Sequence, residues 1–400
     1  MRLKSPYWQV GVLSVGLLLL TAFNGLAAAD QSQNDPPASD NNPAPPHDNP
    51  EVPLLQPLAG LSNEQLQRFA AGKDEFEKEH KGGLPLFNAT KCSACHHQPD
   101  IGGSGPRYRS NFDFGFQSGG QFDPLTAQGG PLLREHALRG TPRQQIPPQA
   151  NAFSLRRVPP LFGLGLVEAI PDEQLKALAD ENDANHDGIS GRAVLSTTGR
   201  VQRFGSQDHV ASLLEFVQKA LEKELGITQT QLASLMRDMI AFSAPVPRDK
   251  IDNTVQEGEK VFRSLGCASC HNPSFTTAPG PFTTADGKEV INVAALQNQV
   301  IFPYSDFLLH DMGPELDDKV ALGRQLGDGF GPGSSAVSSE YRTIPLWGLR
   351  FRGAFLHDGR AANLRQAILF HGGEAAAARA AFLALSAHDM ATLEVFLRSL

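Results

Sequence analysis

Apolar residues recur three and four positions apart along several stretches of the chain, which is the spacing of a helix with one buried face. At the start of the first stretch, Ser62 and Gln65 stand three residues apart in the pattern of a capping box. We therefore predict helices that begin near residue 62 and that cover residues 175–181, 210–225, 228–242, 257–267 and 386–400. No stretch reads as an extended sheet, so the predicted fold class is all-α.

Two stretches lack a hydrophobic period. Residues 30–57 consist mainly of Asn, Asp, Pro, Gln and Ala, which bury too little apolar surface to offset the entropy of ordering, so we expect a disordered linker. Residues 107–160 are rich in Gly, Pro, Gln and Phe. We expect a long irregular loop there, and long loops in compact domains are commonly functional.

The N-terminus has the pattern of a secretory signal peptide. Arg2 and Lys4 precede an apolar run over residues 10–23, and Ala27 and Ala29 form a small-residue cleavage site. We expect residues 1–29 to be removed on export to a bacterial periplasm, with an uncleaved anchor as the alternative. No other long apolar segment follows, so we expect no membrane span in the mature chain.

Net charge narrows the choice of partners. The full chain carries a formal charge of −8, and the loss of Arg2 and Lys4 with the signal peptide makes the mature chain more negative still. Such a chain is not suited to bind nucleic acid or an anionic membrane surface. A local charged patch for docking a small cytochrome remains compatible with this charge.

All four cysteines fall in two copies of a Cys-x-x-Cys-His motif, at residues 92–96 and 267–271. This motif attaches c-type haem: each thiol binds a vinyl group of the porphyrin, and the adjacent histidine binds the iron. Such tight pairs do not suit a disulfide framework, and a zinc site needs four ligands where each motif has three. We therefore predict two covalent haems and one-electron redox chemistry. The residues that hold them are Cys92, Cys95 and His96, and Cys267, Cys270 and His271.

Three longer segments carry a family resemblance: residues 157–171, residues 183–192, and the stretch from Ser305 to Glu374. Together they resemble the di-haem oxidoreductase family often called thiol oxidoreductases, which is related to the bacterial di-haem cytochrome c peroxidases. The resemblance implies two cytochrome c-like haem domains, over residues 58–250 and 251–400, with long irregular loops around the haems. It also implies a peroxidase-like oxidoreductase.

The same resemblance implies a distal ligand for the second haem. In the related peroxidases, a segment similar to residues 345–359 is followed, fourteen residues after its histidine, by the distal ligand of the iron. Here that histidine is His357, and the position matches His371, so the implied ligand pair is His271 and His371. Met312 is the alternative ligand, while His310 and His357 are expected near the haem edge.

The first haem has no such obvious second ligand beside His96, and an open position is what peroxide chemistry requires. Glu168, in the segment resembling the family's distal wall, is the candidate that moves a proton to and from bound peroxide. The weaker candidates for this pocket are His136, His186 and Arg203.

Asp183, Asn185 and Asp187, followed by Gly188, match the first half of a calcium loop. The glutamate required at position twelve is absent, because Val194 stands there, so an EF-hand is excluded. A looser calcium site and a simple turn without metal are both compatible with the pattern.

These observations predict a periplasmic di-haem oxidoreductase of peroxidase type, in which electrons pass from the C-terminal haem to an open N-terminal haem that reduces hydrogen peroxide. A small cytochrome or cupredoxin is the expected donor. The alternatives are a non-catalytic electron carrier and an oxidoreductase for thiols or other sulfur compounds. Related enzymes place a tryptophan between the haems, whereas Trp347 of this chain lies outside the equivalent stretch.

Overall fold

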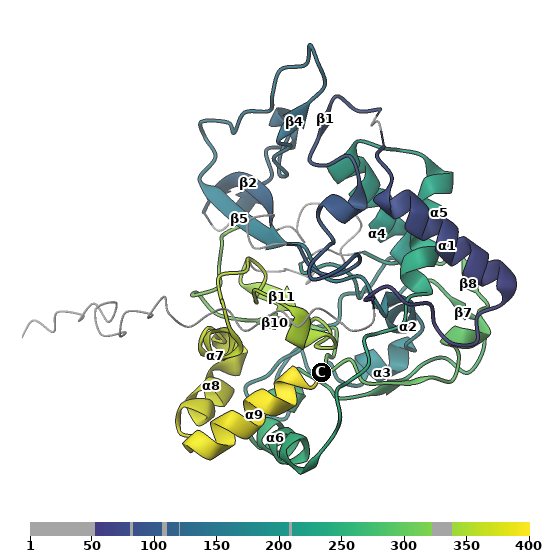
Figure 1. The fold of residues 1–400 in the computed structure, drawn as a ribbon. Helices are drawn as coiled ribbons and strands as arrows, with labels where there is room; N and C mark the ends of the chain where they lie inside the picture. The colour runs from purple at the N-terminus through teal and green to yellow at the C-terminus, as the bar shows by residue number, and fades with distance from the viewer. Residues whose placement is uncertain (1–52, 81–82, 106–109, 120, 208–209, 322–337) are drawn as a thin grey trace, which may run out of the picture. The chain divides into compact units, whose positions relative to one another are not determined.

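The computed structural model describes residues 53–80, 83–105, 110–119, 121–207, 210–321 and 338–400 (Figure 1). The predicted signal peptide and residues 30–52 of the predicted linker lie outside these ranges. Leu54 and Leu55 belong to the same predicted linker, but both are buried in the hydrophobic core. Within the described ranges, no helix has both the length and the apolar character needed to cross a bilayer.

Nine α-helices lie within the described ranges, and each of the six predicted helices overlaps one of them. The nine helices are α1 (Asn63–Glu77), α2 (Leu164–Glu168), α3 (Asp172–Lys176), α4 (Leu213–Ala220), α5 (Thr230–Ala241), α6 (Asn253–Ser264), α7 (Leu364–Leu369), α8 (Ala376–Leu383) and α9 (Ala387–Arg398). The capping box is confirmed, because the Ser62 hydroxyl accepts from the Gln65 backbone and the Gln65 side chain accepts from the Ser62 backbone.

The prediction of an all-α fold is wrong, because the chain also forms small antiparallel sheets. The largest joins β3 (Gln121–Asp123), β2 (Ser110–Ser118) and β5 (Ala152–Arg157) in that order. The remaining strands pair two by two: β1 (Leu86–Phe87) with β4 (His136–Ala137), β6 (Phe275–Thr276) with β9 (Val300–Ile301), β7 (Phe282–Thr283) with β8 (Val290–Ile291), and β10 (Leu309–Asp311) with β11 (Glu340–Arg342).

Strand β5 was not predicted from the sequence. Its buried residues include the polar Ser154 and Arg156, whereas Phe153 and Leu155 are 44% and 46% exposed. The usual strand signal places apolar side chains on the buried face, so this strand is reversed in polarity. Both β2 and β5 fall in the stretch that we expected to be an irregular loop.

Two helix pairs cross at a glycine. In α1, a Cβ on Gly72 would lie 2.4 Å from the Leu235 carbonyl oxygen of α5, and in α6 a Cβ on Gly258 would lie 2.0 Å from the Thr392 carbonyl oxygen of α9. Only glycine lets the two backbones approach this closely. The first helix of each pair precedes one Cys-x-x-Cys-His motif and contacts its first turn, and Figure 1 shows α6 beside α9.

Candidate haem-binding site

The two Cys-x-x-Cys-His motifs fold in the same way. Each begins with a short 3-10 turn, Cys92–Ala94 or Cys267–Ser269, and in each the histidine N–H donates to the carbonyl of the first cysteine, at 3.1 and 2.9 Å. All four thiols are free of disulfides. Burial raises the pKa of Cys92 to about 12 and that of Cys267 to about 11.

Both motif histidines are oriented as metal ligands. His96 Nδ1 lies 2.9 Å from the Pro159 carbonyl oxygen, and His271 Nδ1 lies 3.0 Å from the Tyr304 carbonyl oxygen. A carbonyl can only accept, so each Nδ1 carries the proton and each Nε2 keeps a free lone pair. Burial lowers the pKa of both imidazoles to about 4, and His371 contributes to this shift at His271. Both rings are therefore neutral at physiological pH, as metal binding requires.

A cavity of about 1000 Å³ reaches both motifs. This is the upper end of the ~300–1,000 Å³ range that is usual for cofactor and ligand pockets. Both cysteines and the histidine of each motif line it, together with Trp347 and many apolar side chains. Trp347 is buried and packs against Gly163, where a Cβ would lie 2.6 Å from the indole ring.

His371 lies opposite His271. It follows α7, and its Nδ1 lies 2.6 Å from the Ala367 carbonyl oxygen, which again leaves Nε2 free. The two ring centroids are 6.5 Å apart. Two metal–imidazole bonds of roughly 2 Å each, plus the distance from each nitrogen to its ring centre, nearly span this separation. The geometry therefore fits one iron between the two imidazoles, and the alternative ligand Met312 also lines the cavity.

His310 is not available as a ligand. Its Nε2 lies 2.8 Å from an Asp306 carboxylate oxygen and its Nδ1 lies 2.7 Å from a Glu374 carboxylate oxygen, so both nitrogens are used. Burial opposes the charged ring, but hydrogen bonds to Asp306, Cys270 and Glu374 outweigh it and raise the pKa of His310 to about 12. His310 is thus an imidazolium held between two carboxylates beside Cys270.

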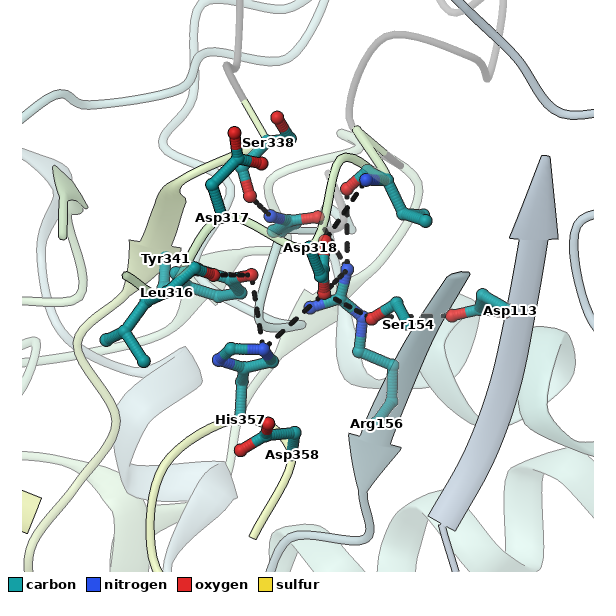
Figure 2. Close-up of polar contacts among 12 residues, drawn as sticks. Asp113, Ser154, Arg156, Leu316, Asp317, Asp318, Ser338, Tyr341, His357 and Asp358 are labelled. Carbon is teal, nitrogen blue, oxygen red and sulfur yellow. Dashed lines mark hydrogen bonds and ion pairs between the residues drawn. The ribbon is translucent and has the colours of Figure 1, made fainter. Parts of the chain in front are cut away.

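A second cluster of polar side chains lines the same cavity. Asp113, Arg156, Tyr341 and His357 form what we call the polar wall, and Asp318 lies behind it (Figure 2). The Asp318 carboxylate lies 3.3 Å from Arg156 Nη2 and 3.4 Å from His357 Nε2, and the Ser154 hydroxyl donates to it. No sequence motif singles out Arg156, Asp318 or Tyr341. The one usable signal was the alternation of Ser154 and Arg156 in a strand.

Two arginines that line the cavity, Arg157 and Arg352, form no ion pair with a carboxylate of the described residues. The Nε of each is buried without a hydrogen-bond partner in this part of the chain. Burial lowers the pKa of Arg157 to about 10, and burial together with the Arg157 charge lowers that of Arg352 to about 9. Buried cations of this kind require an anion. The two carboxylates of a haem provide one, so the donor set of this cavity fits the cofactor.

The structure does not bring Glu168 into the cavity lining. Its carboxylate accepts from the Leu213 backbone N–H at 2.8 Å, and burial raises its pKa to about 7. Arg203 does line the cavity, but its guanidinium is bound by Asp172 and by backbone carbonyls. His136 and His186 are exposed and lie outside the lining.

The loop with the calcium pattern is closed by its own side chains. Asp183 accepts from the Gly188 backbone, Asn185 from the Asp187 backbone, and Asp187 from the Ile189 backbone. Among the described residues, no group of three or more His, Cys, Asp or Glu side chains is arranged to hold a metal ion. Calcium therefore stays a prediction from the sequence.

Comparison with solved structures finds distant likenesses. Hydrazine synthase of Kuenenia stuttgartiensis is 15% identical over 87% of this chain and 95% of that chain, with a TM-score of 0.41. The diheme peroxidase BthA of Burkholderia thailandensis is 15% identical over 86% and 87%, with a TM-score of 0.37. A MauG-like protein associated with microbial copper homeostasis is 13% identical over 66% and 95%, with a TM-score of 0.31.

No curated protein matches the chain. The family profile described as "Di-haem oxidoreductase, putative peroxidase" matches residues 149–234 and 210–400, which is more than half of the sequence. The assignment rests on this match, and haem is the cofactor that it implies. This chain belongs to the di-haem oxidoreductase family.

Proposed function

We propose that this protein is an exported di-haem peroxidase. Its c-type haems are attached covalently at Cys92 and Cys95 and at Cys267 and Cys270, with His96 and His271 as iron ligands. Bound haem iron supplies one-electron redox chemistry and, where one face is open, a position for a small ligand. The overall reaction is H₂O₂ with two electrons and two protons giving two waters.

One observation carries this proposal: the two motif histidines have different surroundings. His271 faces the His371 ring, whose centroid is 6.5 Å away. Each motif histidine also has a phenylalanine nearby, with 6.1 Å between the ring centroids of Phe76 and His96 and 6.2 Å between those of Phe262 and His271. No second imidazole is paired with His96 within the described part of the chain. A pair of imidazoles suits electron transfer, and a position without a protein ligand suits binding and reduction of peroxide.

Each side of the cavity then has its own task. At the C-terminal site, the Tyr304 and Ala367 carbonyls hold both imidazoles in the tautomer that binds iron. Electrons enter there from a small periplasmic cytochrome or cupredoxin and pass to the N-terminal site. Export follows from the signal-peptide pattern of residues 1–29. The sequence pattern of Asp183, Asn185 and Asp187 is compatible with calcium as an additional bound ion.

Optical and EPR spectra of the purified holoprotein test this function. In the half-reduced state, we expect one low-spin haem and one high-spin haem, and the high-spin signal should disappear when peroxide is added. Two low-spin haems that ignore both peroxide and carbon monoxide in every redox state would support the electron carrier instead. Reduction of the haems by a thiol, without any reaction with peroxide, would support the sulfur oxidoreductase.

A further inference from the structure

The polar wall contains a histidine held by a carboxylate. His357 Nε2 lies 3.4 Å from the Asp318 carboxylate and 3.2 Å from the Tyr341 hydroxyl, and the Tyr341 ring stacks on the imidazole with 4.1 Å between centroids (Figure 2). Burial raises the pKa of Asp318, but hydrogen bonds from His357 and Ser154 and the Arg156 charge outweigh it and lower that pKa. Asp318 is therefore a carboxylate at neutral pH, and it fixes the orientation of the ring.

These contacts engage Nε2 of His357 and leave Nδ1 without a hydrogen bond. Within the described ranges, no hydrogen bond engages Nδ1, although His357 lines the cavity and its side chain is only 5% exposed. A buried imidazole with one nitrogen on a carboxylate and the other free is the arrangement of a general base and acid. His371 and His271, by contrast, both use Nδ1 for backbone carbonyls.

Arg156 adds donors without a hydrogen bond to the same wall. Its Nη2 donates to Gln207 Oε1 at 2.9 Å and lies 3.3 Å from Asp318, and its Nε forms a longer ion pair with Asp113 at 3.7 Å. Nε and Nη1 are both buried with no hydrogen-bond partner among the described residues. An unsatisfied buried donor is costly unless a ligand completes it. Arg156 lines the cavity, so its free donors can serve a small oxygen ligand there.

Backbone contacts tie the polar wall to the first motif. The Arg157 N–H donates to the His357 carbonyl at 2.7 Å, and two residues later the Pro159 carbonyl accepts from His96 Nδ1. The short segment from Arg156 to Pro159 therefore runs from the wall to the ligand of the first haem. The second site is already occupied by His371, and His310 with its two carboxylates lies beside it.

We propose that His357 transfers the proton during cleavage of peroxide at the first haem, with Arg156 as the cation that stabilises the departing oxygen and with Asp318 and Tyr341 as positioning residues. This inference rests on the proposed peroxidase function. His357 would accept a proton from one oxygen of the peroxide and return it to the other oxygen. That second oxygen would leave as water as the O–O bond breaks.

Bond cleavage to the first water needs no proton from outside, because His357 only moves one between the two peroxide oxygens. The remaining oxygen atom becomes the second water when it gains two electrons, delivered by the periplasmic donor, and two protons from solvent. Arg156 gains and loses no proton.

The test compares four forms of the half-reduced holoprotein: wild type, His357→Gln, Glu168→Gln and His388→Gln. His388 is a matched control, because its side chain is 76% exposed on α9. Stopped-flow measurement of the reaction with peroxide should show a loss of about 10²–10⁴-fold for His357→Gln, the range typical of a lost acid–base group. The His388 variant and the Glu168 variant should react within a few-fold of wild type.

Binding of carbon monoxide distinguishes failure of the His357 role from failure of the proposed peroxidase function, on which that role rests. Carbon monoxide binds an open ferrous haem without proton transfer, so His357→Gln should bind it as wild type does. If wild type binds neither carbon monoxide nor peroxide, the peroxidase function fails. If wild type reacts with peroxide and His357→Gln reacts equally fast, only the role of His357 fails, and loss of the reaction in Glu168→Gln would transfer that role to Glu168.

A second variant gives an independent measurement should His357→Gln fail to assemble. Asp318→Asn removes the carboxylate that lies 3.4 Å from His357 Nε2 and orients the ring, so the reaction with peroxide should slow while carbon monoxide binds as in wild type. Asp318→Glu, which keeps a carboxylate, should recover part of the rate. An unchanged rate in Asp318→Asn with normal haem spectra would overturn the positioning role of Asp318.

Discussion

His310 and Tyr341 lie directly opposite each other across the antiparallel strands β10 and β11. Side chains paired in this way share one face of the ribbon. His310 belongs to the ion network beside Cys270, and Tyr341 belongs to the polar wall that includes His357. One short ribbon thus holds the surroundings of the second motif in register with the wall that we assign to the first.

The ligand at position 371 should control the potential of the second haem. We expect His371→Met to keep this haem low-spin and to raise its midpoint potential, because a thioether favours the ferrous state relative to a second imidazole. His371→Ala should convert the same haem to high-spin. Redox titration followed by EPR measures both changes.

Met312→Leu is the control for that experiment, because Met312 is the alternative ligand and lines the same cavity. Its spectrum and potential should match those of wild type. The reverse result, with normal spectra in His371→Ala and a high-spin haem in Met312→Leu, would assign the ligand to Met312.

Each pair of cysteines should hold one haem independently. We expect the double variant Cys92→Ser/Cys95→Ser to retain a single covalent haem, and Cys267→Ser/Cys270→Ser likewise. Mass spectrometry of the denatured protein should detect two haems in wild type and one in either variant. Two noncovalent haems in wild type would contradict covalent attachment.

The ion network around His310 should make stability depend on pH at both ends of the scale. The folded-state pKa of His310 is raised to about 12 from 6.5, so its contribution is complete below pH 6.5 and is lost as pH rises toward 12. The pKa of Glu374 is lowered to about 2 from 4.5, so its contribution is complete above pH 4.5 and is lost as pH falls toward 2.

Glu374→Gln tests this network. It leaves the buried imidazolium with one carboxylate, which should lower the free energy of unfolding by up to about 3–5 kcal/mol near pH 6. Denaturant unfolding at several pH values should show that the difference from wild type shrinks above pH 6.5 and below pH 4.5. A difference that does not shrink above pH 6.5 or below pH 4.5 would show that the network is not the cause.

The crossing of α6 and α9 should not tolerate a side chain at Gly258. A Cβ there would meet the Thr392 carbonyl oxygen at 2.0 Å, so Gly258→Ala forces the helices apart. Overpacking of this kind costs about 1–3 kcal/mol. Gly280→Ala is the matched control, because no atom lies within 4 Å of its added Cβ, and its change in unfolding free energy should stay within about 0.5 kcal/mol.

The arginine pair should raise a haem potential. Arg352 and Arg157 place positive charge in the cavity, and positive charge disfavours the ferric state. We expect Arg352→Gln to lower the midpoint potential of one haem, with a smaller change in Arg352→Lys. Equal potentials in wild type and both variants would show that the pair does not act on the cofactor.

Much of the helical part of the fold could be predicted from local sequence. Helices α1 and α5 lie where the sequence predicts them. Their signals are local: the capping box at Ser62 and Gln65, and the apolar stripe of residues 228–242. Strand β5 could not be predicted in this way. Its buried face carries Ser154 and Arg156, and only contacts from distant segments make those polar positions favourable inside the molecule.

The sequence by itself pointed to the chemistry, because a Cys-x-x-Cys-His motif is complete within five residues. Its resemblance to the di-haem peroxidases pointed to His371, at the position of their distal ligand. The tertiary structure alone decided which polar groups share the cavity. Arg156 and Tyr341 line it, although they are far apart in the chain, whereas Glu168 is turned to the Leu213 backbone. The physical reason is that burying a charged group is favourable only when distant segments provide its partners, and no local pattern records which segments will meet.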